Sequence, residues 1–299
     1  MQRIHHGLFL ILSSAQIYAE GWQPQAAPTP PPIIYQKTIK TSLSAQTLGF
    51  AAAVDTELYD IGNPTDEEQH YLELINRARA NPTQEGIFLA TNTDPSVLAS
   101  IQQYGVNLTL MKAEFAALPS RMPLAFNKEL NIAARLHNQY QFDEALQTHD
   151  SANGDKVWHR VEAAGYEYSS VGENVFSYAS NSIHGHIGFQ IDWGPPTAPG
   201  DTDGMQDPRG HRDNIHADFR EIGIGVINGT NTVAGRTVGS QLVTQNFGSN
   251  LYDEAFVTGV AYNDVNGNSF YDPGEGIGGL TVTVEGADYH AITTNSGGY

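Results

Sequence analysis

The stretch GHRDNIHADFREIGIG, residues 210–225, decides how this chain folds. Histidines, arginines and acids crowd its first half, and its second half alternates isoleucine with glycine, which favours a buried strand. A charged lead-in to such a strand is either a solvated loop or one wall of a site. The choice depends on which other residues of the chain could face this stretch.

Helical patterns dominate the chain before residue 210, and strand patterns follow it. In segment 63–82 Thr65 and Glu68 form a capping-box pattern, and Pro82 is expected to end the helix. Further helices are expected at 95–105, 109–119, 127–148 and 183–194, and strands at 222–229 and 240–248. Because strands and helices do not alternate regularly, the sequence predicts an α+β fold with helices over an antiparallel sheet.

His137 lies on the apolar face of the helix expected at 127–148, together with Leu130, Ala133 and Ala134. An inward-facing histidine is more often hydrogen-bonded in a core than bound to a ligand. We therefore expect a core role for His137.

The composition is globular and strongly acidic. Of the 299 residues 40% are hydrophobic and 16% charged, and 33 acidic residues against 15 basic ones give a formal net charge of −18. Such a field repels nucleic acid and anionic membranes and favours divalent cations, so no nucleic-acid partner is expected. The absence of cysteine excludes disulfides, thiolate metal sites and a cysteine nucleophile.

The chain divides into four parts. Residues 1–19 indicate a secretory signal peptide, and residues 20–60 a Pro-rich linker. A first domain is expected at 61–252. A composition change near Ala255 indicates a second unit at 255–299, and we interpret this unit as part of a longer module. No later stretch could span a bilayer. Export of a chain without cysteine favours a bacterial extracellular or cell-surface protein.

Six segments occur in the order that is typical of the CAP superfamily: LELINRARANP, LNIAARLHNQY, THDS, GENVF, GHRDNI followed by IGIGV, and LVTQNFG. Over residues 66–250 the chain resembles a bacterial member of these cysteine-rich secretory, antigen-type and pathogenesis-related proteins. The resemblance implies a three-layer α-β-α sandwich with a central cleft. It also implies that two histidines and two acids line the cleft, and that the histidines can bind a divalent ion such as zinc.

The family motifs match His149 in THDS, Glu173 in GEN and His211 in GHR. The second acid of the family lies on the helix before the last histidine, where the segment IHGHIGFQIDWG, residues 183–194, has no glutamate. The polar candidates there are His184, His186 and Asp192, and Asp192 is assigned to the cleft. In the opening stretch His211 is therefore expected to face the cleft, with Arg209, Arg212, Asp213 and Asn214 organising the loop and His216 and Asp218 in solvent.

Two interpretations of the cleft stay open. His149 and His211 supply two imidazoles for a tetrahedral ion such as zinc, and a carboxylate could hold a bound water or fix a ring tautomer. Two protein ligands would bind such an ion loosely. Alternatively, Glu173 and the histidines form a buried hydrogen-bonded network that locks helix to strand.

The segment DVNGNSFYDPGE, residues 264–275, has the spacing of a calcium loop. Oxygen ligands fall at positions one, three, five, seven, nine and twelve: Asp264, Asn266, Asn268, the carbonyl of Phe270, Asp272 and Glu275. Ser269 replaces the usual glycine at position six, so the turn differs from an EF-hand. With its strand-like flanks, the segment resembles the calcium-binding B-type repeats of bacterial adhesins, which implies a prealbumin-like β-sandwich and a structural calcium ion.

Three functions fit these features. The first is a secreted, non-catalytic module that binds a protein, glycan or lipid beside a calcium-stabilised repeat. The second is a hydrolase in which His149, Glu173 and His211 activate a water. Ser151 and Ser177 lack a nucleophile-elbow setting, and the missing glutamate disfavours catalysis. The third treats the chain as the stalk or tip of a larger surface protein. The binding module is preferred.

Overall fold

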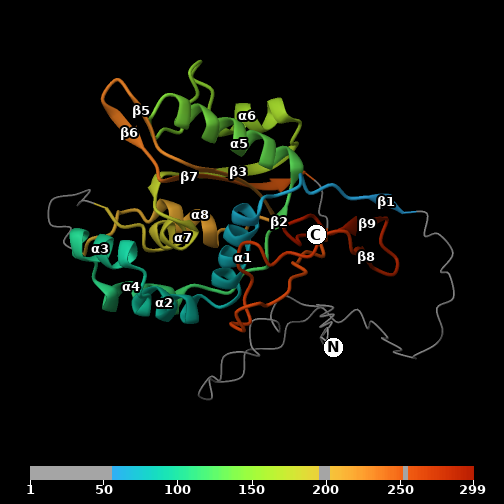
Figure 1. Cartoon of the computed structure of the whole chain (residues 1–299), viewed down its shortest axis with the longest axis horizontal. Helices are drawn as coiled ribbons and strands as arrows, with labels where there is room; N and C mark the ends of the chain where they lie inside the picture. The colour runs from blue at the N-terminus through green and yellow to red at the C-terminus, as the bar shows by residue number, and fades with distance from the viewer. Residues whose placement is uncertain (1–55, 195–202, 252–254) are drawn as a thin grey trace.

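The computed structural model describes residues 56–194, 203–251 and 255–299, and the predicted signal peptide and most of the predicted linker lie outside these ranges. Helices and a sheet are both present, which confirms the α+β class. Helices cover both faces of the main sheet, so the domain has three layers (Figure 1). Within the described residues, every helix is too short or too polar to cross a bilayer.

The main sheet has four strands in the order β2-β4-β7-β3. They are β2 (Ala125–Phe126), β3 (Tyr168–Ala179), β4 (Glu221–Asn228) and β7 (Gln241–Asn250). The short β2 is parallel to β4, and the other neighbours are antiparallel. Strands β4 and β7 are buried along most of their length, as their apolar sequences predict.

Helices α5 (Lys128–Asp143) and α6 (Val157–Ala164) cover one face of this sheet (Figure 1). The backbone of α5 approaches β4 so closely that a Cβ atom at Gly223 would overlap Leu130 and Asn131. This approach explains the alternating glycines of the opening stretch. His137 is buried on α5 and bonds the carbonyl of Thr148 through Nε2 (2.8 Å), which confirms its core role.

The other face is covered by α1 (Asp66–Ala80), α7 (Ser182–Ile191) and α8 (Gly210–His216), with α2 (Pro82–Thr91), α3 (Pro95–Tyr104) and α4 (Leu108–Ala117) beyond them (Figure 1). The capping box at Thr65 and Glu68 is formed as predicted. Helix α1 ends at Ala80, just before Pro82, as predicted, and Pro82 is the first residue of α2, which Asn81 caps. Proline suits that position, where no amide donor is needed.

Two small sheets complete the described structure. A hairpin of β5 (Asn231–Val233) and β6 (Arg236–Val238) connects β4 to β7 in the chain. A three-stranded sheet joins β1 (Glu57–Leu58), β9 (Tyr289–Ile292) and β8 (Thr281–Thr283), with β1 parallel to β9. The β-sandwich predicted for residues 255–299 is not confirmed, since their sheet takes its third strand from the segment that precedes α1.

Candidate functional site

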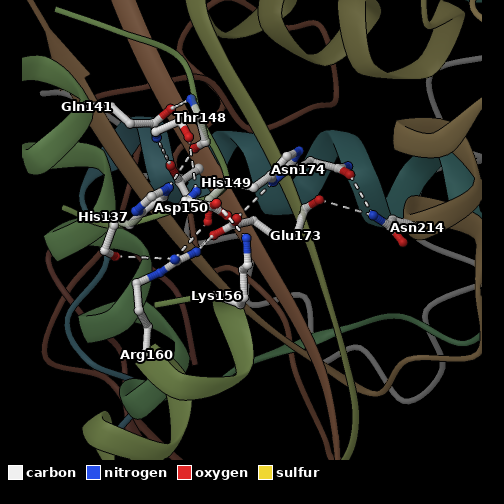
Figure 2. Close-up of polar contacts among 12 residues, drawn as sticks. His137, Gln141, Thr148, His149, Asp150, Lys156, Arg160, Glu173, Asn174 and Asn214 are labelled. Carbon is white, nitrogen blue, oxygen red and sulfur yellow. Dashed lines mark hydrogen bonds and ion pairs between the residues drawn. The ribbon is translucent and has the colours of Figure 1, made fainter. Parts of the chain in front are cut away.

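His149 and Glu173 form the first half of the predicted cleft. Glu173 lies on β3 with its side chain buried, and His149 lies in the loop between α5 and α6 with its side chain 57% exposed. The Nδ1 atom of His149 is 2.9 Å from Oε1 of Glu173 (Figure 2). A carboxylate only accepts hydrogen bonds, so the Nδ1–H group of His149 is the donor in this pair.

The second oxygen of Glu173 is also occupied. Arg160 of α6 donates to Oε2 through Nη2. The Asn246 side chain lies beside the same oxygen, and with its amide nitrogen turned toward Oε2 it donates at 3.1 Å. Arg160 also donates to the backbone oxygens of His149 (2.9 Å) and Asp155 (2.8 Å), so it ties the loop to the strand (Figure 2). Glu173 is therefore held on both oxygens by nitrogen donors.

His211 and Asp192 form the second half. Asp192 follows the last residue of α7 in the left-handed conformation (φ 58°), which turns its side chain toward α8. Its Oδ1 is 2.6 Å from Nδ1 of His211, and its Oδ2 accepts the His211 backbone N–H at 2.9 Å. The other two candidates point elsewhere, because His184 bonds Ser100 and His186 bonds Glu85.

The two pairs approach β3 from its two helical sides. Asn174 lies next to Glu173 on β3, and its Nδ2 donates to the backbone oxygen of His211 at 3.1 Å. Asn214 of α8 donates to the backbone oxygen of Glu173 (3.2 Å) and to Oδ1 of Asn174 (2.9 Å) (Figure 2). Asn214 thus bonds a backbone group of β3 rather than of its own turn. Neighbouring residues of a strand point to opposite faces, so Glu173 and Asn174 serve opposite sides.

The charged half of the opening stretch is a helix, α8, rather than a loop. Asp218 is exposed as expected, but the prediction that His216 is solvated is wrong. His216 is buried, with Nε2 bonded to Gln190 (3.0 Å) and its ring edge-on to Phe115. Burial lowers its pKa to about 3, so it is neutral at ordinary pH.

Arg209 and Arg212 organise this region as expected. Arg212 donates to the backbone oxygens of Gln190 (2.6 Å) and Ile191 (2.9 Å), which are orphan acceptors at the end of α7. Arg209 pairs with Asp203 at 2.7 Å. Arg212 thus holds α8 against the end of α7, where Asp192 meets His211, and Arg209 holds the loop that precedes α8.

A closed metal site does not fit the cleft. Among the described residues no group of three or more His, Cys, Asp or Glu could hold a metal ion, so His149, Glu173, His211 and Asp192 do not form one. The Nε2 atoms of His149 and His211 have no hydrogen-bond partner within the described part of the chain. At most, the cleft offers two imidazoles, each oriented by a carboxylate, as metal-binding histidines usually are. Two imidazoles are only half of the four ligands of a tetrahedral zinc site. Loose zinc binding stays a prediction.

Sequence reasoning missed Arg160 and Asn246. Arg160 follows Trp158 and His159 in a helix that carried no clear periodicity, and nothing in the sequence joins it to Glu173 thirteen residues later. Asn246 stands directly opposite Glu173 in the β3–β7 register. Asn246 lies in the strand predicted at 240–248, and this prediction was the only sequence signal for a contact with Glu173.

The predicted calcium loop closes on itself. Oδ1 of Asp264 accepts the backbone N–H groups of Gly267 (2.8 Å) and Asn268 (3.1 Å), and Oε1 of Glu275 accepts that of Val265 (2.9 Å). The carboxylate of Asp272 accepts both Asn266 and Asn268 side-chain amides at 2.7 Å. The expected ligand residues thus share one loop. Among the described residues, however, no group of three or more His, Cys, Asp or Glu could hold a metal ion, and this includes Asp264, Asp272 and Glu275, so calcium binding there stays a prediction.

Comparison with known proteins places the chain in a family. A solved structure, an extracellular protein containing a SCP domain from Bacillus anthracis str. Ames, is similar with 20% sequence identity and a TM-score of 0.32. The match covers 52% of this chain and 44% of that one, and at this TM-score it adds no argument on fold or function. No match was found among curated proteins. Residues 72–247, more than half of the chain, match the model of the cysteine-rich secretory protein family, and the chain therefore belongs to the CAP family.

Proposed function

We propose that this chain is an extracellular, non-catalytic binding module of the CAP family. The observation that carries the proposal is the occupancy of both carboxylates in the candidate cleft. Glu173 binds His149 and Arg160, and Asp192 binds His211 through both oxygens. A carboxylate that itself acts as general base needs an oxygen free to reach a water or substrate proton, and the oxygens of Glu173 and Asp192 are engaged by these donors. These carboxylates instead fix two imidazoles.

The module binds its ligand through the solvent-exposed parts of His149 and His211, which approach β3 from its two sides. The His149 side chain is 57% exposed and that of His211 is 23% exposed, so both rings are accessible from solvent. A protein, a surface glycan or a lipid headgroup could each accept or donate a hydrogen bond at Nε2. A loosely bound divalent ion is a further occupant at these histidines, and no step of the function passes through it.

Residues 255–299 add a calcium-stabilised repeat in this proposal. The ligand spacing in 264–275 supports calcium, because short oxygen side chains at alternate positions suit a hard cation. Rotation of the Asn266 and Asn268 amides would present their oxygens beside Asp272 in place of their nitrogens. At the calcium concentrations outside cells, weak sites of this kind fill.

The test compares hydrolysis and binding in the full chain. Hydrolysis is followed with p-nitrophenyl acetate and fluorescent casein, and binding by calorimetric titration of the metal-stripped protein with Zn²⁺. We expect no turnover above background, and weak zinc binding that the double substitution His149→Ala, His211→Ala removes. Turnover that Glu173→Gln abolishes would overturn the proposal in favour of the hydrolase. Lys128→Ala, in an exposed ion pair with Asp60, is the matched control.

A further inference from the structure

Three buried nitrogen atoms are unpaired where α7 meets α8 (Figure 1). They are Nδ1 of His186, Nε2 of Gln190 and Nδ1 of His216, and none of them has a hydrogen-bond partner within the described residues. The three residues are 0%, 0% and 5% exposed. A buried polar group without a partner costs free energy, so this group of atoms calls for an occupant that pairs with them.

The three side chains form one cluster. His186 and Gln190 are four residues apart on α7, so they share a face of the helix, and the side chain of Gln190 leans back toward His186. Oε1 of Gln190 lies 3.0 Å from Nε2 of His216, the last residue of α8. The pKa of His216 is lowered mainly by burial, and nearby charges that include Glu85 and His186 also act on it. His186 is therefore a neighbour of both other residues.

The bonds that these residues already make define what the unpaired atoms can do. Burial lowers the pKa of His186, so its ring is neutral at ordinary pH. Its Nε2 is 2.8 Å from a carboxylate oxygen of Glu85, which only accepts, so Nε2 carries the proton and Nδ1 is an acceptor. Nε2 of His216 faces the Gln190 oxygen, so Nδ1 of His216 is also an acceptor. Nε2 of Gln190 is a donor, and the cluster thus presents two acceptors and one donor.

This set does not depend on the orientation of the Gln190 amide. With its oxygen and nitrogen exchanged, Gln190 would donate to Nε2 of His216, whose Nδ1 would then carry the proton. Two acceptors and one donor would again be unpaired. A water molecule has two O–H donors and accepts through its lone pairs, so it matches either arrangement. A cation would leave the donor unpaired, and among the described residues no group of three or more His, Cys, Asp or Glu could hold a metal ion.

We propose that one buried water molecule bridges His186, Gln190 and His216. Buried waters make about three hydrogen bonds to groups that are otherwise unpaired, and this cluster offers that number. The bridge ties α7 to α8 beside one half of the candidate cleft, since Gln190 lies two residues before Asp192 and His216 lies five residues after His211. It positions that half whatever ligand the cleft takes.

The first test uses the wild-type full chain, isotope-labelled for NMR. Long-range proton–nitrogen spectra of the imidazoles show which ring nitrogens carry protons, and water-selective Overhauser spectra show which side chains contact a long-lived water. We expect an unprotonated Nδ1 in His186 and a long-lived water at the Gln190 amide. The amide of Gln139, exposed on α5, is the control and should contact only short-lived water. A protonated Nδ1 in His186, or hydration of Gln190 as short-lived as that of Gln139, would overturn the bridge.

A second test separates the bridge from the direct bond between His216 and Gln190. In His216→Gln the amide nitrogen replaces Nε2 and keeps the bond to Gln190, but the acceptor at the water is lost. In His216→Asn the amide oxygen replaces Nδ1, so the acceptor is kept and the bond to Gln190 is lost. We expect the long-lived water to be absent from His216→Gln and present in His216→Asn.

Amide hydrogen exchange in α8 measures how much the bridge holds the helices together. We expect exchange to be roughly tenfold faster in His216→Gln than in the wild type, the effect of one hydrogen bond lost at a buried group. A water retained in His216→Gln, or exchange in α8 as slow as in the wild type, would show that the bridge does not tie α8 to α7. Because the first test uses the wild type, the proposal stays falsifiable if a variant does not fold.

Discussion

Asp192 holds His211 by two hydrogen bonds, one to the backbone N–H at 2.9 Å and one to the ring Nδ1 at 2.6 Å. The carboxylate side chain is 1% exposed, and the imidazole is 23% exposed. The backbone bond fixes where α8 begins, and the ring bond fixes the tautomer. An aspartate one residue beyond the end of α7 thus orients both the backbone and the ring of His211.

Asp192→Asn should reduce the free energy of unfolding by about 1–3 kcal/mol, because the buried site loses one charge-assisted hydrogen bond. The matched control is Asp218→Asn, whose side chain is 80% exposed and which should change stability by less than about 0.5 kcal/mol. Urea unfolding of the two variants and the wild type measures the difference. Equal midpoints for wild type and Asp192→Asn would show that this contact does not stabilise the fold.

Arg160 and Lys156 offer a comparison of a buried and an exposed ion pair in one loop region (Figure 2). Arg160→Ala leaves the buried carboxylate of Glu173 without its cation, and should cost about 3–5 kcal/mol. Lys156→Ala breaks an exposed pair with Asp150 and should cost about 0–1 kcal/mol. Thermal unfolding monitored by circular dichroism checks both. Similar melting temperatures for the two variants would contradict the role of Arg160.

Much of the fold follows from local signals. The capping box of Thr65 and Glu68 locates the start of α1, and the alternation in 222–229 locates β4. Helix α8 could not be found this way, because its seven residues are held by tertiary contacts. Arg79, buried on α1, donates to the backbone oxygens of Ile215 (2.6 Å) and Ala217 (2.8 Å), and so closes the end of α8 from a distant part of the chain.

In the candidate site, too, the sequence predicts some residues and misses others. The ordered motifs locate His149, Glu173 and His211, because each lies in a short segment of fixed pattern. The partners of these residues depend on geometry that the sequence does not encode locally. Asp192 reaches His211 because its backbone is left-handed, and Arg160 reaches Glu173 on β3 from helix α6. Burial of His216 likewise depends on Phe115, about a hundred residues away.

The stability of the fold should decline as pH falls from 6.5 to 4.5. Burial lowers the pKa of His70 to about 4 and that of His216 to about 3, and it also lowers that of His186. The unfolded chain therefore takes up protons below pH 6.5 while the folded chain does not, which favours unfolding. For a histidine shifted like His70 the full loss is on the order of 3 kcal/mol, reached at about pH 4.

Urea unfolding at pH 7.5, 6.5, 5.5 and 4.5 checks this pH dependence. Burial raises the pKa of Glu85, but the cation of Arg77 and the bond to His186 outweigh burial and lower it to about 2, so Glu85 adds most of its own loss below pH 4.5. Most of the decline within the chosen window therefore comes from the histidines. His216→Asn should flatten the profile, whereas His159→Asn, an exposed control, should not. A wild-type profile that is flat over this window would count against buried neutral histidines.

The glycines of the opening stretch give the sharpest packing test. Gly223→Ala places a methyl group against the backbone of Leu130 and Asn131 on α5, and backbone of a packed helix cannot move aside cheaply. We expect a loss of about 3 kcal/mol or more. Gly210→Ala, at the first residue of α8, meets nothing within 4 Å and should be neutral or stabilise by about 0.4–1 kcal/mol, since alanine restricts the unfolded chain. Urea unfolding of both variants decides whether close approach of α5 to β4 imposes glycine at position 223, because an alanine tolerated equally at both positions would show that the two backbones are not in contact.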